Sequence, residues 1–237
     1  MTAEQALKQR VEAIQYRMAA AATRVGRDPA EVALLPVSKT RPAEAVTAVA
    51  TGTGLVRFAE NRPQELAAKA RELDGIEWVL IGPLQTNKAA LVAEYACQFQ
   101  GLDALRTAEA LDRRLQALGR GMDVLVEVNT SGEAAKHGVA PGEALALARG
   151  LGAFSSLRPA GLMTVAVNSP DEKAVRACFA RLREVQAQLR DALGDGWDEL
   201  SMGMSGDFEW SIEEGSTIVR VGTAIFGPRP MPPDAQA

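Results

Sequence analysis

Hydrophobic and polar positions follow two different periods along the chain. Short runs of apolar and β-branched residues recur between longer stretches that have helical spacing. The short runs that predict strands are Val32–Val37, Leu55–Ala59, Trp78–Ile81, Cys97–Gln100, Val124–Val128, Pro159–Met163, Glu199–Ser201 and Thr217–Val221. The pattern therefore predicts eight strands with helices between them.

Two of the helical stretches are especially clear. Residues 3–24 have apolar positions on one side with charges between them, so the chain opens with a helix ahead of the first strand. The stretch Asp171–Asp191 keeps its apolar residues at helical spacing, with Arg and Glu on the opposite face. Ser169 is the expected cap of this second helix, and Pro170 is expected in its first turn.

Short strands that alternate with helices indicate a parallel sheet with right-handed crossovers. Eight such units in 237 residues fit an α/β fold of one closed (β/α)8 barrel of the TIM type, preceded by an extra helix. An open, doubly wound sheet is the alternative. Because no linker or low-complexity tract divides the chain, we expect residues 1–237 to form a single domain. Residues 228–237 hold four prolines and are expected to be a loose tail.

Charge and hydropathy narrow the classes of function. The formal net charge is −4 and the pI is near 5.3, which argue against a general nucleic-acid-binding surface. The longest uncharged runs, Ala45–Val56 and Pro159–Pro170, fall short of the roughly 18 to 20 residues that a membrane span requires. The N-terminus has no signal-peptide pattern. We therefore expect a cytoplasmic protein that binds neither nucleic acid nor membranes, and a monomer.

Cysteine and histidine are scarce. Cys97 and Cys178 are far apart and have no Cys or His neighbours, so both are expected to be ordinary buried thiols. A structural zinc site needs about four ligands, and the chain has only these two cysteines and His137. No metal is expected, and His137 is expected at the surface or in a cap.

Polar or glycine-rich segments follow nearly every predicted strand. A parallel barrel carries its chemistry at the C-terminal ends of its strands. Lys39 directly follows the first strand, so its side chain is expected at the barrel mouth. A lysine there can extend into solvent, or, if it is partly desolvated, it can attack a carbonyl carbon and form a Schiff base.

Two further segments follow the seventh and eighth strands, where barrels commonly bind phosphate. Ser205 with Gly206, and Gly222 with Thr223, offer hydroxyl groups and closely approachable backbone N–H groups. Ordinary glycine turns are the alternative. Arg220 lies two residues before Gly222, so strand alternation points both to the same face. This arginine either pairs with a buried carboxylate or contacts a ligand beside the phosphate.

A Schiff-base lysine, a phosphate site and an arginine together suggest pyridoxal phosphate. The lysine would bind the aldehyde of this cofactor, and the hydroxyl and glycine groups would bind its phosphate. An aldolase that forms a Schiff base with a sugar phosphate would use the same three elements. The residues taken one by one leave both interpretations open.

Seven motifs, in order along almost the whole chain, resemble the pyridoxal phosphate homeostasis family. They are Val37–Thr40, Phe58–Asn61 with Gln64 and Glu65, Ile81–Lys88, Val128–Asn129 with Glu133 and Lys136, Gly161–Thr164, Leu200–Asp207 and Arg220–Gly227. Members of that family are single barrels similar to the N-terminal domain of alanine racemase, a type III fold among pyridoxal-phosphate proteins. One departure is that Val79-Leu80 replaces the His-Phe usual in the family, so no role of that histidine is carried over.

The resemblance implies eight cofactor-binding residues, which are Lys39, Asn61, Met163, Ser205, Gly206, Arg220, Gly222 and Thr223. It implies that Lys39 holds pyridoxal 5′-phosphate as a Schiff base and that the serine, threonine and glycines hold the phosphate. Asn61 and Met163 would line the ring. Arg220 would lie beside the pyridine nitrogen, where a cation disfavours protonation of that nitrogen.

The same resemblance implies intracellular pyridoxal phosphate (vitamin B6) homeostasis, without an established reaction. Alanine racemase adds a second domain and a tyrosine base that faces the lysine. Here about 15 residues follow the last strand, too few for a domain, and Tyr16 and Tyr95 fall on predicted helices. We therefore expect a non-catalytic carrier, with apo forms of pyridoxal-phosphate enzymes as candidate recipients. The alternatives are an amino-acid racemase-type enzyme and a Schiff-base aldolase.

Overall fold

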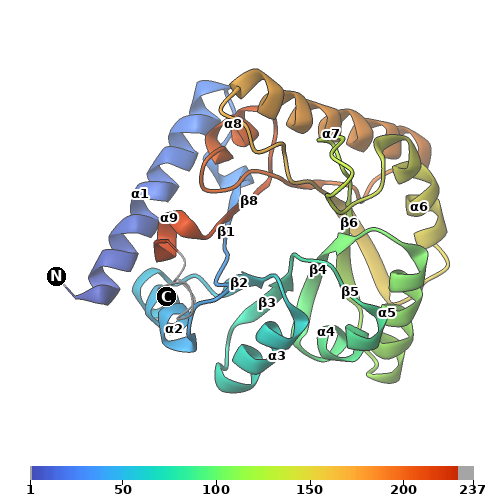
Figure 1. The fold of residues 1–237 in the computed structure, drawn as a ribbon, viewed down its shortest axis with the longest axis horizontal. Coiled ribbons are helices and arrows are strands. Elements are labelled where there is room, and N and C mark those ends of the chain that lie inside the picture. The colour runs from blue at the N-terminus through green and yellow to red at the C-terminus, as the bar shows by residue number, and fades with distance from the viewer. Residues whose placement is uncertain (1, 229–237) are drawn as a thin grey trace, which may run out of the picture.

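The computed structural model describes residues 2–228, and its strands form one parallel sheet that curves into a barrel ringed by helices (Figure 1). The predicted (β/α)8 barrel with an N-terminal helix is confirmed, and the open doubly wound sheet is wrong. The predicted loose tail lies, except for Pro228, outside the described residues.

All eight predicted strands are present, with ends shifted by at most two residues. The strands are β1 (Ala33–Pro36), β2 (Arg57–Glu60), β3 (Glu77–Leu80), β4 (Ala96–Leu102), β5 (Met122–Glu127), β6 (Leu157–Met163), β7 (Glu199–Ser201) and β8 (Ile218–Val221). The α-helices are α1 (Ala3–Arg24), α2 (Ala43–Thr53), α3 (Pro63–Glu72), α4 (Ala89–Tyr95), α5 (Leu105–Ala117), α6 (Ala144–Leu151), α7 (Glu172–Leu193), α8 (Phe208–Glu213) and α9 (Thr223–Phe226). Short 3₁₀ helices cover η1 (Pro29–Glu31), η2 (Thr86–Lys88) and η3 (Pro141–Glu143).

The strand order around the sheet is β1-β8-β7-β6-β5-β4-β3-β2. The two end strands approach each other just past their last residues, where the N–H of Ser38 donates to the carbonyl of Ala59 at 3.0 Å. Val37 and Ala59 form a parallel bridge at the same point. This contact closes the ring and brings the C-terminal ends of all eight strands to one rim.

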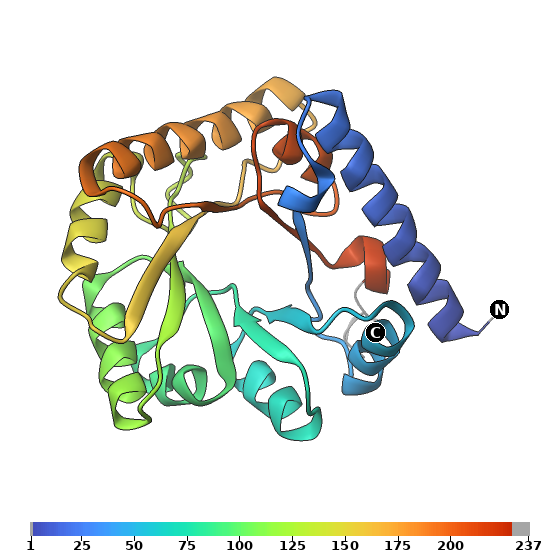
Figure 2. The same ribbon diagram turned by 180° about the vertical axis from the view of Figure 1, so that it is seen from behind.

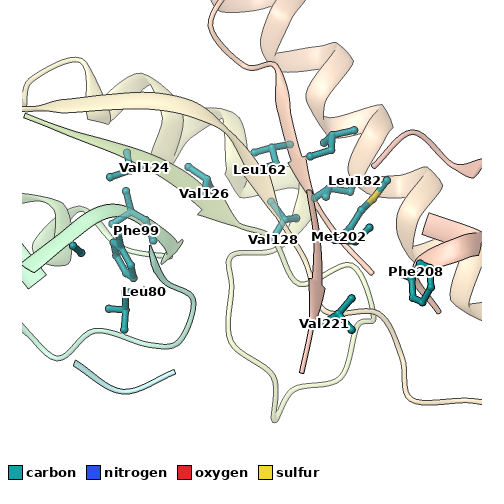
Figure 3. Close-up of a cluster of buried hydrophobic side chains, with 14 of the residues drawn as sticks. Leu80, Phe99, Val124, Val126, Val128, Leu162, Leu182, Met202, Phe208 and Val221 are labelled. Atoms are coloured by element: carbon teal, nitrogen blue, oxygen red, sulfur yellow. The ribbon is translucent and has the colours of Figure 1, made fainter. Parts of the chain in front are cut away.

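The apolar residues pack in two layers because side chains alternate across each strand. A large cluster fills the space between the strands and the helices, with Val124 and Val126 of β5 and Val128 just after it among its members (Figure 3). A small cluster, which consists of Leu35, Val37, Ala59, Val79 and Ile218, fills part of the barrel interior. Buried polar side chains, among them Gln98, Gln100 and Arg220, share this interior.

Helix α1 covers the side of the barrel where β8 meets β1, and it packs against α2, α8 and α9 (Figure 2). The helices that follow β7 and β8 are short, so they leave this side without a full-length covering helix. Arg27 joins α1 to this region by donating to the carbonyls of Ile212 and Ser216 at 2.8 and 2.9 Å. The extra N-terminal helix therefore completes the outer layer.

Two local predictions need correction. Helix α7 begins at Glu172, and its cap is Asp171, whose carboxylate accepts from the N–H of Lys173. Ser169 instead accepts from the N–H of Asp171, one step earlier, and Pro170 lies before the helix. The cap therefore lies two residues later than predicted, and the turn at 169–171 precedes the helix. Of the two free thiols, Cys178 is buried, but Cys97 is only partly buried. Within residues 2–228, no helix has both the length and the apolar character needed to cross a membrane.

Candidate functional site

A cavity of about 250 Å³ lies at the C-terminal rim of the barrel, between the ends of β1, β7 and β8. It is lined by Val37, Lys39, Ile81, Met204, Ser205, Gly206, Arg220, Gly222 and Thr223. Six of the eight site residues predicted from the sequence are in this set. These six residues come from the ends of β1, β7 and β8, which the barrel topology brings to one rim.

Asn61 and Met163, the other two predicted site residues, do not line this cavity. Asn61 lines a neighbouring cavity of about 510 Å³, together with Arg62 and Gln85. Met163 is almost fully buried, with 1% of its surface exposed. The contact of these two side chains with a ring stays a prediction. Gly82 belongs to this region because a Cβ there would lie 2.2 Å from the backbone oxygen of Asn61.

The alternation of side chains along the strand directs the Lys39 side chain into the cavity. Val37 belongs to the interior cluster, and Lys39, two residues further on, is partly buried and lines the cavity. Ser38 has no exposed surface, and its side chain hydrogen bonds to Glu60 rather than into the interior. Thr40 follows with a φ of 63°, in the left-handed region that β-branched residues rarely adopt. The predicted mouth position of Lys39 is confirmed.

The four residues expected to bind phosphate face the cavity from two loops. A Cβ added to Gly206 would meet no atom within 4 Å, which shows open space beside this backbone. A Cβ added to Gly222 would lie 3.0 Å from the carbonyl oxygen of Val37, so the loop after β8 packs closely on β1. The Ser205 hydroxyl accepts from the N–H of Ala224 at 3.3 Å and joins the two loops.

Arg220 is buried, and its hydrogen bonds go to neutral groups. It donates to the carbonyl and hydroxyl oxygens of Ser201 and to the carbonyl of Thr164, each at 2.7 Å. Pairing with a carboxylate was one of the two alternatives for Arg220, and these hydrogen bonds do not support it, although Glu127 and Asp207 attract the guanidinium at longer range. Burial lowers the pKa of Arg220 to about 10, so this side chain is a cation at neutral pH.

A chain of buried hydrogen bonds continues from Arg220 into the barrel. The Ser201 hydroxyl donates to Gln100 at 2.7 Å, and Gln100 donates to Gln98 at 2.8 Å. Gln98 then donates to the carboxylate of Glu199 at 2.6 Å. Sequence reasoning missed these residues. The polar positions Gln98 and Gln100 within an otherwise apolar strand were the available signal.

Glu127 is another interior residue that sequence reasoning missed. It lies at the end of β5 with 7% of its surface exposed. Burial raises its pKa to about 7, although the positive charge of Arg220 opposes this effect. Burial also raises the pKa of Asp207, whose carboxylate accepts from the N–H of Met204 at 2.5 Å. The site thus combines one buried cation with carboxyl groups that ionise less readily than usual.

The remaining candidates lie away from this cavity, as predicted. His137 is exposed and lines a different cavity with Asp103 and Arg106. Tyr16 on α1 is 78% exposed, and Tyr95 ends α4, where its ring lies under the guanidinium of Arg71. Among residues 2–228, no group of three or more His, Cys, Asp or Glu side chains is arranged to hold a metal ion.

Comparison with known proteins points to one family. The model of the alanine racemase N-terminal domain matches residues 10–230. The pyridoxal phosphate homeostasis proteins of Vibrio cholerae and Pseudomonas aeruginosa are each 42% identical to this chain, and each alignment covers 94% of this chain and 96% of the relative. The Escherichia coli K12 protein of the same name is 40% identical, with 91% and 94% covered.

Solved structures agree with these matches. PipY of Synechococcus elongatus, with pyridoxal phosphate bound, superposes with a TM-score of 0.78 at 33% identity, covering 90% of this chain and all of PipY. The structure of an unknown protein from Bifidobacterium adolescentis superposes with a TM-score of 0.87 at 36% identity. The match covers 94% of this chain and 95% of that protein. Alanine racemase of Clostridium difficile gives 0.74 at 13% identity, covering 96% of this chain and 58% of the racemase, which shows a shared fold.

Proposed function

Since the chain belongs to the family of pyridoxal phosphate homeostasis proteins, we propose that it binds pyridoxal 5′-phosphate in the cavity at Lys39 and acts in the homeostasis of this cofactor. The observation that carries this proposal is the meeting of an amine, hydroxyl-bearing glycine loops and a buried cation in one cavity. Each of these groups has a chemical counterpart on the cofactor.

The residues present fit the cofactor. Its phosphate needs several hydrogen-bond donors and room for a close approach of the backbone, and the open space beside Gly206 supplies that room. Ser205, Gly206, Gly222 and Thr223 are called the phosphate cradle below. A side chain at position 206 would project into the space that the phosphate needs.

Lys39 and Arg220 would act at the two other ends of the cofactor. The Nζ amine of Lys39 would hold the cofactor covalently at its aldehyde end. When bound, the cofactor supplies a conjugated ring that can withdraw electrons from an attached amine. Arg220 is held by Ser201 and Thr164 as a cation and would keep the neighbouring ring nitrogen unprotonated, which weakens that withdrawal.

We further propose that the protein is a non-catalytic, cytoplasmic and monomeric carrier that supplies apo forms of pyridoxal-phosphate enzymes. Racemisation by two bases needs a proton donor or acceptor on each face of the substrate carbon. Of the residues that line the cavity, Lys39 and Arg220 are the ionisable ones, and Arg220 is engaged by backbone carbonyls. Neither Tyr16 nor Tyr95 lines it. The names of the relatives also favour a role in homeostasis.

The test is a visible absorption spectrum of the purified protein with added pyridoxal phosphate, before and after borohydride reduction, with mass mapping of the modified residue. We expect a yellow species that reduction fixes on Lys39. The Lys39→Ala variant should lose this adduct and keep its unfolding temperature, because a lysine at the rim contributes little to the core. Lys173→Ala on α7, which lies outside the cavity, is the matched control and should label normally.

Two outcomes would overturn the proposal. A Lys39→Ala protein with a reducible adduct at another lysine contradicts the assignment of the site. A wild-type protein that takes up no pyridoxal phosphate contradicts the function and favours the sugar-phosphate aldolase instead. Incubation of the loaded protein with L-alanine, followed by chiral chromatography, distinguishes the carrier from a racemase, which would produce D-alanine in a Lys39-dependent manner.

A further inference from the structure

A buried lysine lies behind the backbone that carries Lys39. Lys69 of α3 is 6% exposed, and its Nζ donates to the carbonyl of Ser38 at 2.8 Å. The same ammonium group contacts the carboxylates of Glu60 at 2.5 Å and Glu65 at 3.0 Å. Ser38 also donates its hydroxyl to Glu60 at 2.7 Å. One charged cluster therefore holds the residue immediately before Lys39.

The residue immediately after Lys39 is held by the same cluster. The carboxylate of Glu65 accepts from the N–H of Thr40 at 2.6 Å. Thr40 has a φ of 63°, which is unfavourable for a β-branched residue and persists only where the surroundings enforce it. Glu65 is itself paired with Lys69, so the cation, the carboxylate and the left-handed residue form one connected unit.

This unit and the cavity lie on opposite sides of the backbone of residues 38–40. Ser38 is fully buried and bonds to Glu60, whereas Lys39 lines the cavity. Anchoring both flanking residues leaves the Lys39 side chain as the part of this segment that faces the cavity. A turn with Thr40 in the extended region would change the direction of the backbone just after Lys39.

We propose that Glu65 and Lys69 are positioning residues that hold Thr40 in its left-handed conformation and thereby direct the Lys39 amine at the cofactor aldehyde. This inference rests on the proposed function, and it adds the device that prepares Lys39 for covalent attachment. Neither residue touches the cavity, because neither is among its lining residues. Their effect on the cofactor passes through the backbone at 38–40.

The test compares Glu65→Ala with the double variant Glu65→Ala/Thr40→Gly. Pyridoxal phosphate is titrated into each protein, and the visible band of the Lys39 adduct reports affinity and attachment rate. We expect Glu65→Ala to weaken binding about 10-fold, equivalent to about 1.4 kcal/mol, and to slow attachment similarly. Glycine adopts positive φ without a steric penalty, so Thr40→Gly should restore most of the loss in the double variant.

Asp112→Ala is the matched control. Asp112 is also a buried carboxylate that accepts a backbone N–H, from Ser156 at 2.8 Å, but Ser156 lies just before β6, at the opposite end of the barrel. Its loss should lower the unfolding temperature and leave attachment unchanged. If Glu65 had a merely structural role, Glu65→Ala would behave like Asp112→Ala, with a lower unfolding temperature and an unchanged attachment rate. Thr40→Gly would then have no loss of cofactor attachment to restore.

Wild-type protein that binds the cofactor, combined with Glu65→Ala that binds equally well, would overturn this inference and leave the proposed function intact. Wild-type protein that does not bind would overturn both. If Glu65→Ala does not fold, Lys69→Met provides a second test, because it removes the ammonium group that contacts Ser38, Glu60 and Glu65. This variant must then show the same slowed attachment of the cofactor. Lys69→Arg keeps the cation and its donors, so it should attach the cofactor faster than Lys69→Met; equal rates in the two would also contradict the inference.

Discussion

The side chain of Ser205 joins the two loops of the phosphate cradle. Its hydroxyl accepts from the N–H of Ala224, and it lines the cavity at the same time. A hydroxyl placed this way can turn its proton toward a phosphate oxygen. Under the proposed function, this hydroxyl would link the geometry of the two loops to the binding of the phosphate.

Ser205→Ala should weaken retention of pyridoxal phosphate by about 1 to 2 kcal/mol, the scale of one hydrogen bond to a charged group. Equilibrium dialysis of the loaded protein measures the change, which corresponds to a dissociation constant raised roughly 5- to 30-fold. Ser155→Ala removes an exposed serine that does not line the cavity and serves as the control. Equal retention by the two variants would remove Ser205 from the cradle.

At the scale of elements, the pairing of β6 with β7 depends on a glycine. A Cβ on Gly161 would lie 1.9 Å from the carbonyl oxygen of Glu199 and 2.6 Å from its carbon. Both atoms are backbone, so a strand must move to accept a side chain. Strand β7 is only three residues long and carries Ser201, which holds Arg220. The close approach of two strands is thus coupled to the position of the buried cation.

Gly161→Ala should lower the free energy of unfolding by about 2 kcal/mol or more, near the upper range for overpacking. Urea denaturation measures this, and cofactor affinity should fall with it because Arg220 loses its alignment. Gly142→Ala adds the same methyl group where no atom lies within 4 Å, and its stability should be unchanged or slightly higher. If both variants are equally stable, the two strands are not packed as closely as described.

At the scale of the whole molecule, buried carboxyl groups make stability depend on pH. The pKa of Glu127 rises from 4.5 to about 7 because burial disfavours its charged form. Burial raises the pKa of Glu60, Glu199 and Asp207 in the same direction. The folded protein then binds more protons than the unfolded chain in this window, so stability falls as the pH rises from 4.5 to about 7 and levels off above it.

Glu127→Gln should remove its share of this dependence. The shift of the Glu127 pKa from 4.5 to about 7 changes the free energy of unfolding by at most roughly 3 kcal/mol, if this group titrates independently of the others. Urea denaturation at pH 5, 6, 7 and 8 should therefore show wild-type protein losing stability relative to Glu127→Gln as the pH rises. Glu109→Gln, on the exposed face of α5, should run parallel to wild type. Parallel curves for Glu127→Gln as well would show that this carboxyl group is not buried as described.

The sequence by itself determined the eight strands, the first helix and the mouth position of Lys39. These features depend on local periodicity and on which residue follows a strand, and both can be read from neighbours in the chain. Six cavity residues followed from the same rule, because a closed parallel barrel gathers all strand ends at one rim. The family motifs added Asn61 and Met163, which lie outside this cavity.

Only the tertiary structure decided which groups each buried side chain meets. Arg220 was expected to pair with a carboxylate or a ligand, but its hydrogen bonds go to Ser201 and Thr164. The contacts of Lys69 with Ser38 and of Glu65 with Thr40 join residues 31 and 25 positions apart. Such contacts depend on strand order, on helix rotation and on which oxygen lies closest in space. No local period encodes these three quantities, and they are set only when the barrel closes.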